Sequence, residues 1–228
     1  MGINAALNPL LSELAKRVKF SGVVCTLGVM ELDSGGDPRA YFSRLDFSTL
    51  QALDISDFEG ADHIFDLNED ELPERLVSQF DAVFNGGTLE HVFHVPNALT
   101  SITRMLRPGG VVVHVLPCNG WVNHGFYQIS PTLMFDYYEA AFFEPLESAL
   151  YSRDLEHPDK WTVRPMRPGE PGDGQAGSID RGLHLYLFAA RRGEKLSIVP
   201  GRSNGFTLDQ RRRAKVRVGF FPTLSKMA

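Results

Sequence analysis

The chain has 228 residues, which is enough for one large domain or a domain with extensions, and its 43% of hydrophobic residues supply a substantial core. A formal net charge of -5 argues against a general nucleic-acid binder, since such proteins carry a basic surface. The two cysteines, Cys25 and Cys118, lie within or beside predicted buried strands, so we expect no disulfide framework and a reducing compartment.

Apolar segments are short throughout the chain. None reaches the ~18 residues of a membrane-spanning helix. The amphipathic start MGINAALNPLLSELAKRVKF lacks the apolar core and cleavage pattern of a signal peptide. We therefore expect a cytoplasmic protein with neither a membrane nor a nucleic acid as partner.

The first third of the chain alternates predicted helices and strands, and two of the strands end in an aspartate, Asp54 and Asp66. In chain order we expect a helix after Pro9, a strand over residues 22–27 that ends at Gly28, a helical segment over 40–45, strands over 49–53 and 61–65, and a short helix over 73–79.

The stretch from residue 80 to residue 117 predicts one βαβ unit. An apolar run stops at Asn85-Gly86-Gly87, a helical pattern covers residues 95–106, and Pro108-Gly109-Gly110 precedes an apolar strand over residues 111–116. Near-continuous apolar strands are typical of parallel sheets that helices cover on both faces. Ligands of such sheets lie beyond the carboxyl ends of the strands, where the Asn85 loop is expected.

The alternation, with no internal repeat, predicts an α/β fold with a Rossmann-like, doubly wound, mostly parallel sheet. An aromatic loop, a helix near Pro131, an extended segment over 142–152 and a strand over 182–190 follow. Residues 1–190 are thus expected to form one α/β domain. Residues 164–182, rich in Pro and Gly, are expected to be a mobile loop, either a lid or an insertion. Residues 191–228 form a C-terminal extension whose basic residues indicate a solvated helix or a homo-oligomer contact.

Four segments together resemble the class I S-adenosylmethionine-dependent methyltransferases. They read LDISDFEGADHIFDLN, FDAVFNGGTLEHVF, RMLRPGG and NHGFYQISPTLMFDYYE. More narrowly, they are similar to a methyltransferase-like group of sugar, surface-polysaccharide and natural-product biosynthesis, over roughly residues 22–143.

The resemblance implies a place for the cofactor. The loop around Gly28 would run alongside the methionine and ribose part of S-adenosylmethionine. Asp54 would accept hydrogen bonds from the ribose hydroxyls, and Asp66 would face the adenine amino group. Gly87, after the fourth strand, would allow close approach of the ligand. A solvated turn or a helix cap is the alternative for each aspartate.

One segment departs from the family pattern. Residues 26–32 lack the usual acidic residue and glycine run, and only Gly28 fits. Val29 and Met30 are expected to bring side chains to the place where the backbone would approach the ligand.

The candidate catalytic residues are Glu90, His91 and His124, any of which could take a proton from a hydroxyl or amine acceptor. Trp121 and Tyr127 are expected to wall the acceptor pocket. Structural alternatives exist for each: Glu90 could be a first-turn acid on a helix, and His91 could bond backbone groups. His94 would form an H-x-x-H pair with His91 that could hold a metal with His124, but no Cys or carboxylate spacing supports it, so no metal is expected.

These features predict S-adenosylmethionine-dependent methyl transfer to a hydroxyl or amine of a small molecule, such as a sugar or secondary metabolite. The alternative is a non-catalytic, methyltransferase-like binding or scaffold subunit with a degenerate cofactor site. A dinucleotide enzyme is weaker still, because no G-x-G-x-x-G follows the first strand.

Overall fold

The computed structural model describes residues 2–3, 7–33, 35–154, 156–157, 160–167 and 182–197. Most of the expected mobile loop, and the C-terminal extension from residue 198 onward, lie outside the described residues. No helix in the described part of the chain is both long enough and apolar enough to cross a membrane.

One eight-stranded sheet organises the protein, in the order β5-β4-β2-β6-β7-β10-β8-β9. The first five strands in this order pair in parallel, and β10, β8 and β9 extend the sheet by antiparallel pairing. The strands are β2 (Val23–Leu27), β4 (Thr49–Asp54), β5 (His63–Ile64), β6 (Phe80–Asn85), β7 (Leu106–Asn119), β8 (Phe143–Arg153), β9 (Trp161–Pro165) and β10 (Leu183–Arg192). The predicted α/β, mostly parallel sheet is confirmed.

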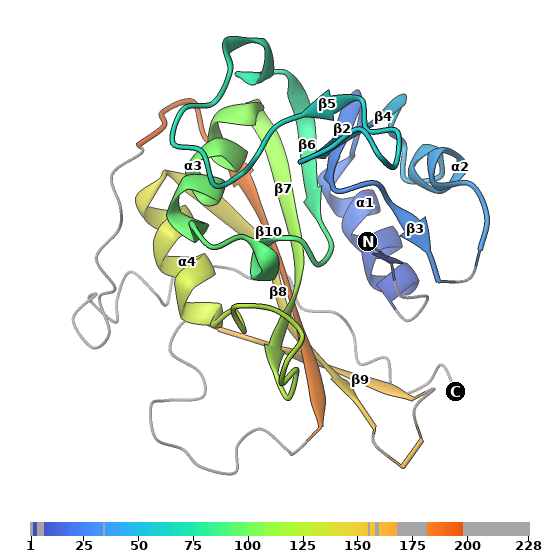
Figure 1. Ribbon diagram of the computed structural model, residues 1–228. Coiled ribbons are helices and arrows are strands. Elements are labelled where there is room, and N and C mark those ends of the chain that lie inside the picture. Colours follow the sequence, from blue (N-terminus) through green and yellow to red (C-terminus); the bar gives the residue numbers. More distant parts are fainter. Residues whose placement is uncertain are drawn as a thin grey trace.

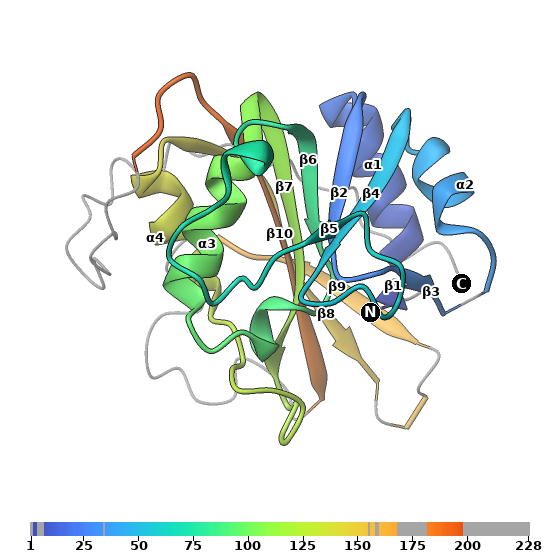
Figure 2. The same ribbon diagram turned by 45° about the horizontal axis from the view of Figure 1, so that its top comes forward.

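Helices cover both faces of the sheet (Figures 1 and 2). α3 (Val95–Met105) and α4 (Pro131–Ala140) pack on one face, and α1 (Asn8–Val18) and α2 (Pro38–Ser43) pack on the other. Each face has its own apolar cluster, because β-strand side chains alternate between the two sides. The largest fully buried side chains include Tyr138 on the α3–α4 side and Phe42 on the α1–α2 side.

Several expected elements differ in length from the observed ones. The third strand is only His63–Ile64, and the short helix is a 3-10 turn, η2 (Glu74–Leu76). β7 begins directly after α3 and bulges at residues 107–110, opposite Asp81, because its partners step from Phe80↔Leu106 to Ala82↔Val111. β10 continues through Arg192, two residues beyond the expected domain boundary.

Three short strands were not predicted. β1 (Gly2–Ile3) pairs in parallel with β3 (Glu31–Leu32), a stretch expected to be loop, and β9 forms the edge of the main sheet. β9 reads WTVRP, with alternating half-buried and exposed residues that end at a proline. An edge strand tolerates such a composition because only one side of its backbone is paired.

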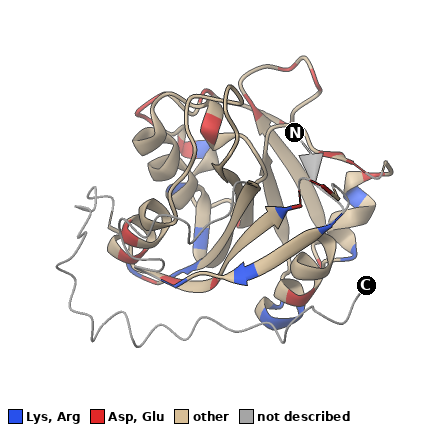
Figure 3. Cartoon of the chain, turned by 90° about the horizontal axis from the view of Figure 1, so that it is seen from below, with Lys and Arg blue, Asp and Glu red and all other residues tan. Residues whose placement is uncertain are grey.

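Acidic and basic side chains are interspersed over the helices and strands of the described part in Figure 3. No single-sign face is seen in that view. The mixed distribution in this view agrees with the small net charge.

Candidate active site

The end of β6 is held by a buried network centred on Asn85. The Asn85 Oδ1 accepts hydrogen bonds from the backbone N–H groups of Thr88 (3.1 Å) and Leu89 (3.4 Å). Its Nδ2 therefore faces His114 and donates to Nδ1 at 2.9 Å, which leaves the proton of neutral His114 on Nε2, 2.6 Å from the Tyr138 hydroxyl. Burial lowers the pKa of His114 to about 3. His114 is thus a buried side chain with a hydrogen bond at each ring nitrogen.

The loop after β6 is also tied to the strand beside it. The Thr88 hydroxyl donates to the carbonyl of Leu27, the last residue of β2, at 2.5 Å. Gly87 has φ +105°, and a Cβ there would lie 3.3 Å from Glu90 Oε1. The 3-10 turn η3 (Leu89–His91) then turns Glu90 inward and His91 outward. Thr88 thus joins the loop that carries Glu90 to the end of β2, next to Gly28.

Glu90 carries a buried carboxyl group without a hydrogen bond. The residue is 0% exposed, and in the described part of the chain neither carboxyl oxygen has a hydrogen-bond partner. Burial raises the pKa of Glu90 to about 7. A buried polar group without a hydrogen bond costs stability, and such groups cluster at functional sites, so Glu90 is a candidate functional residue.

Two histidine rings face this carboxyl group. The Nε2 atoms of His124 and His91 lie 3.6 Å and 4.0 Å from Glu90 Oε1, and the two ring centroids are 5.2 Å apart. Both side chains are nearly half exposed. Burial, and then the proximity of His124, lower the pKa of His91. The three candidate catalytic residues therefore form one cluster.

His124 reaches Glu90 because the loop after β7 folds back onto η3. The backbone N–H groups of Phe126 and Tyr127 donate to the Glu90 carbonyl at 2.8 Å and 3.2 Å. A Cβ at Gly125 would lie 2.8 Å from the same oxygen, so only glycine allows this approach. In Figure 1 the yellow-green loop that follows β7 lies beside the green segment between β6 and α3.

Aromatic side chains border the cluster on its open side. The Trp121 ring lies 5.1 Å from the His124 ring, and its indole N–H donates to the His184 carbonyl at 3.0 Å. The Tyr127 hydroxyl donates to the Phe93 carbonyl. Phe93 and Phe126 are 61% and 66% exposed, with ring centroids 5.8 Å apart. The loop after β7 thus turns the Phe126 ring outward.

The expected cofactor residues Gly28 and Asp54 sit at the carboxyl ends of neighbouring strands. Gly28 has φ +83°, and its N–H donates to the Leu53 carbonyl at 2.7 Å. Asp54 is half-buried, and within the described residues its carboxylate accepts a hydrogen bond from the Ser56 N–H that is long at 3.4 Å. Most of the acceptor capacity of Asp54 is thus open to a ligand.

Asp66 stabilises a turn. Its Oδ1 accepts hydrogen bonds from both the backbone N–H and the side-chain Nδ2 of Asn68, each at 2.8 Å. Asn68 in turn accepts the His94 N–H before α3. The contact of Asp66 with adenine stays a prediction. It would have to use Oδ2, because Oδ1 already accepts two hydrogen bonds.

Met30 does not lie where the sequence suggested. It is 5% exposed and packs in the apolar cluster under α1 and α2, away from a ligand crevice. The expectation that its side chain obstructs the cofactor is wrong, because the chain after Gly28 turns this residue into the core. Val29 is half-buried.

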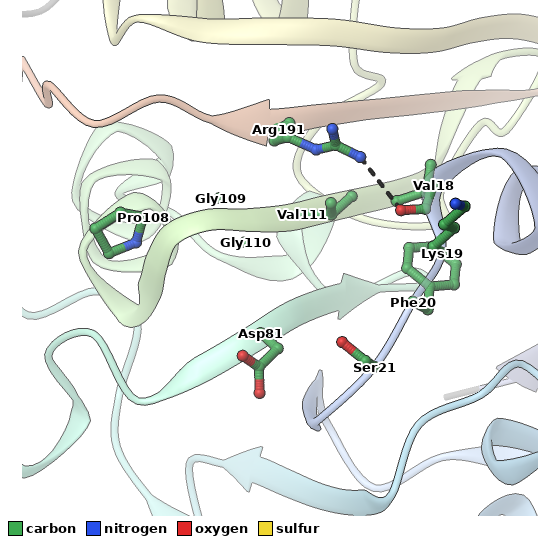
Figure 4. Close-up of a pocket in the computed structure, with 10 residues that line it drawn as sticks. All are labelled: Val18, Lys19, Phe20, Ser21, Asp81, Pro108, Gly109, Gly110, Val111 and Arg191. Atoms are coloured by element: carbon green, nitrogen blue, oxygen red, sulfur yellow. Dashed lines mark hydrogen bonds between the residues drawn. The ribbon is translucent and has the colours of Figure 1, made fainter.

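A pocket of about 380 Å³ lies at the opposite edge of the sheet, where β2, β6 and β7 begin (Figure 4). The Arg191 guanidinium donates to the Val18 carbonyl across it, and Asp81 lines its other side. None of the expected site residues lines this pocket, so it is separate from the Glu90 cluster.

Comparisons with known proteins agree on the fold. Residues 44–114 match the family model described as a methyltransferase domain. A search of curated protein sequences gave no match. Among solved structures, a candidate methyltransferase from Bacillus halodurans aligns with TM-score 0.51 and 13% identity over 80% of this chain and 98% of its own. This protein has the class I methyltransferase fold.

Two further structures share this methyltransferase fold. Phosphoethanolamine N-methyltransferase 2 from Haemonchus contortus, solved with phosphomonomethylethanolamine and S-adenosylhomocysteine, has TM-score 0.51 and 14% identity over 82% of this chain and 53% of its own. The [4+2]-cyclase SpnF has TM-score 0.51 and 18% identity over 82% and 81%. Proteins of the family matched by residues 44–114 use S-adenosylmethionine.

The fold thus gathers Glu90, His91, His124, Trp121 and Tyr127 in one place. His94 is outside the cluster and packs its ring against Phe93. The sequence reasoning missed Asn85, which holds the loop, and Gly125, which lets the second loop approach. The polar residue between an apolar strand and Gly86-Gly87 was the available signal for Asn85.

Proposed function

We propose that this protein transfers the methyl group of S-adenosylmethionine to a hydroxyl or amine of a small molecule, a sugar or secondary metabolite. The observation that carries the proposal is the buried Glu90 carboxyl group, faced by two histidines at the carboxyl edge of the methyltransferase sheet. The Thr88–Leu27 hydrogen bond joins this cluster to the loop at Gly28.

The local geometry fits the cofactor. Asp54 offers acceptor oxygens for paired ribose hydroxyls, and Gly28 presents backbone rather than a side chain. Met30 packs in the core. Of the two side chains expected to keep the cofactor away from the backbone, only that of Val29 is left. When bound, S-adenosylmethionine supplies an electrophilic methyl group on a sulfonium.

The protein residues then align the acceptor and accept its proton. In an in-line displacement the sulfur–methyl bond breaks as the bond from methyl to the acceptor oxygen or nitrogen forms, so positioning and water exclusion dominate. His124 and Glu90 are the groups to which the acceptor proton would pass. The aromatic rings of Trp121 and Tyr127 would hold a sugar or an aromatic acceptor against the cluster.

Replacement of Asp54 by alanine tests the cofactor side. We expect Asp54→Ala to weaken S-adenosylmethionine binding by about 1–3 kcal/mol, because charge-assisted hydrogen bonds to the ribose are lost. Asp57→Ala, an exposed aspartate three residues later, is the matched control and should leave affinity unchanged. Isothermal titration of folded protein measures both. No binding of the cofactor at millimolar concentration would refute the proposed function, and equal affinities would remove Asp54 from the site.

A non-catalytic binding subunit is the second candidate. It is favoured by residues 26–32, where Gly28 is the only residue that fits the usual glycine-rich pattern and Glu31–Leu32 pairs with β1 instead. A folded protein that binds no cofactor and copurifies with an enzyme would support this candidate, and turnover of methyl groups would exclude it.

A further inference from the structure

We propose that Glu90, His91 and His124 together bind a divalent first-row transition metal ion, for which Zn²⁺ is the best probe. One ligand atom from each of the three residues lies within 4.8 Å of the others. The contacts from the Glu90 Oε1 to the histidine Nε2 atoms are 3.6 Å and 4.0 Å. Tetrahedral coordination with bonds of 2.0–2.1 Å needs ligand separations of about 3.4 Å, so modest side-chain rotations would complete the site.

The burial of Glu90 is the second, independent observation. Its carboxyl group is fully buried and aimed at the two rings, and within the described residues neither oxygen has a hydrogen bond. The ion pairs described for Glu90 involve only His91 and His124, and no lysine or arginine. A metal ion would satisfy this carboxylate while the imidazoles stay neutral.

The donor set indicates the class of metal. Two imidazole nitrogens and one carboxylate suit zinc, cobalt, nickel or manganese, whereas Mg²⁺ and Ca²⁺ prefer oxygen ligands alone. Three protein ligands with an open position are typical of catalytic rather than structural sites. The exposed sides of both rings, and the absence of a side chain at Gly87 beside Oε1, leave room for a fourth ligand.

The Trp121 ring borders the cluster beside His124, with ring centroids 5.1 Å apart. An acceptor hydroxyl bound to the metal would lose its proton more readily, because a metal ion lowers the pKa of a coordinated oxygen. With the metal in place, that proton would pass to solvent water, because Glu90 and His124 would then be ligands and not bases. This role rests on the proposed methyl transfer, whereas metal binding itself does not.

Zn²⁺ titration of the full chain, purified without a histidine tag, tests the site through competition with a chromophoric chelator. We expect one equivalent bound by the wild type. Glu90→Gln, His91→Ala and His124→Ala should each weaken binding at least tenfold. His94→Ala is the matched control, because His94 belongs to the same H-x-x-H sequence but lies outside the cluster, and it should bind as the wild type does. Circular dichroism verifies that each variant is folded.

Three results would overturn the proposal: no stoichiometric Zn²⁺ binding by the wild type, equal weakening by His94→Ala, or retention of full affinity in the three cluster variants. Co²⁺ provides a second readout, since visible absorption of the bound ion reports nitrogen and oxygen coordination. Mg²⁺ at tenfold excess should not displace Zn²⁺, and displacement would also contradict the donor argument. S-adenosylmethionine titration on the same samples distinguishes this test from that of the proposed function, because either ligand can bind without the other.

Discussion

At the scale of the residue, the hydrogen-bond chain through Asn85, His114 and Tyr138 orients the loop that carries Glu90. The donor and acceptor roles along these hydrogen bonds are fixed, because the Asn85 side-chain oxygen already accepts the loop N–H groups. His114 must therefore stay neutral, with Nδ1 as acceptor. The loop geometry consequently depends on a protonation state and not only on packing.

Acid should weaken the fold through this histidine. The folded-state pKa of His114 is about 3 and the unfolded value is about 6.5, so below pH 6.5 the unfolded chain binds more protons and stability falls as pH falls. We expect wild type to lose up to about 1.4 kcal/mol per pH unit relative to His114→Gln between pH 6.5 and 4.

Denaturant unfolding at each pH measures this difference. The comparison between the two proteins is needed because the raised pKa of buried Glu90 gives a slope of opposite sign in both. Parallel stability curves for wild type and His114→Gln would contradict the assignment of the acid sensitivity to His114.

At the scale of the element, β2 and β7 are joined at their beginnings through Asp81 of β6. One carboxylate accepts the Val23 N–H at 2.7 Å and pairs with the Arg107 guanidinium at 3.0 Å. Gly22 makes room for it, since a Cβ at this position would lie 2.0 Å from Asp81 Oδ2. The start of three adjacent strands thus depends on one glycine.

Gly22→Ala should therefore destabilise the protein more than a comparable substitution elsewhere. Gly60→Ala is the matched control, because Gly60 has a similar positive φ (+77° against +71°) but open space around its Cβ position. Both should cost about 1–2 kcal/mol for the left-handed backbone. Gly22→Ala should cost about 1–3 kcal/mol more, since the carboxylate must move away from its partners. Urea midpoints measure the two, and equal losses would show that Asp81 moves without cost.

At the scale of the whole molecule, one ion pair joins segments that are 130 residues apart. Arg17, at the end of α1, donates to the Glu147 carboxylate of β8 at 2.6 Å. Glu147 is 0% exposed, and burial raises its pKa despite the lowering effect of Arg17. The pair connects the amino-terminal helix to the antiparallel half of the sheet.

Arg17→Ala should cost about 1–3 kcal/mol of unfolding free energy. The loss leaves a buried carboxylate without its cation, but Arg17 is partly exposed, so the cost is below that of a fully buried pair. Lys16→Ala breaks the neighbouring exposed pair with Glu13, also 2.6 Å long, and should cost less than about 0.5 kcal/mol. Thermal and urea unfolding of both variants measure this contrast, and similar costs would contradict the role of burial.

Strong periodic patterns made the parallel half of the sheet predictable. The apolar runs of β2, β4 and β6 and the helical spacing of α1 and α3 match the observed elements within a few residues. β9 was missed because the alternation in WTVRP covers only five residues and ends at a proline. Its pairing with β8 is decided by the sheet edge.

The cluster was predictable as a set of residues but not as a geometry. Glu90 and His124 are far apart in sequence, and their proximity depends on a carbonyl oxygen that accepts two N–H groups of the returning loop. Local sequence rules do not describe such contacts between loops. The same limitation explains Met30, whose burial follows from the turn of the chain after Gly28.

The position of β10 between β7 and β8 affects how the protein folds during its synthesis on the ribosome. Residues 183–192 pair between β7 and β8, which both leave the ribosome before β10 does. Until they arrive, β7 and β8 each present an unpaired edge, and the buried apolar residues of β10 are absent from both faces of the core. Nascent chains that stall before this strand would expose edges that favour aggregation, so the sheet closes only after residue 192 has emerged.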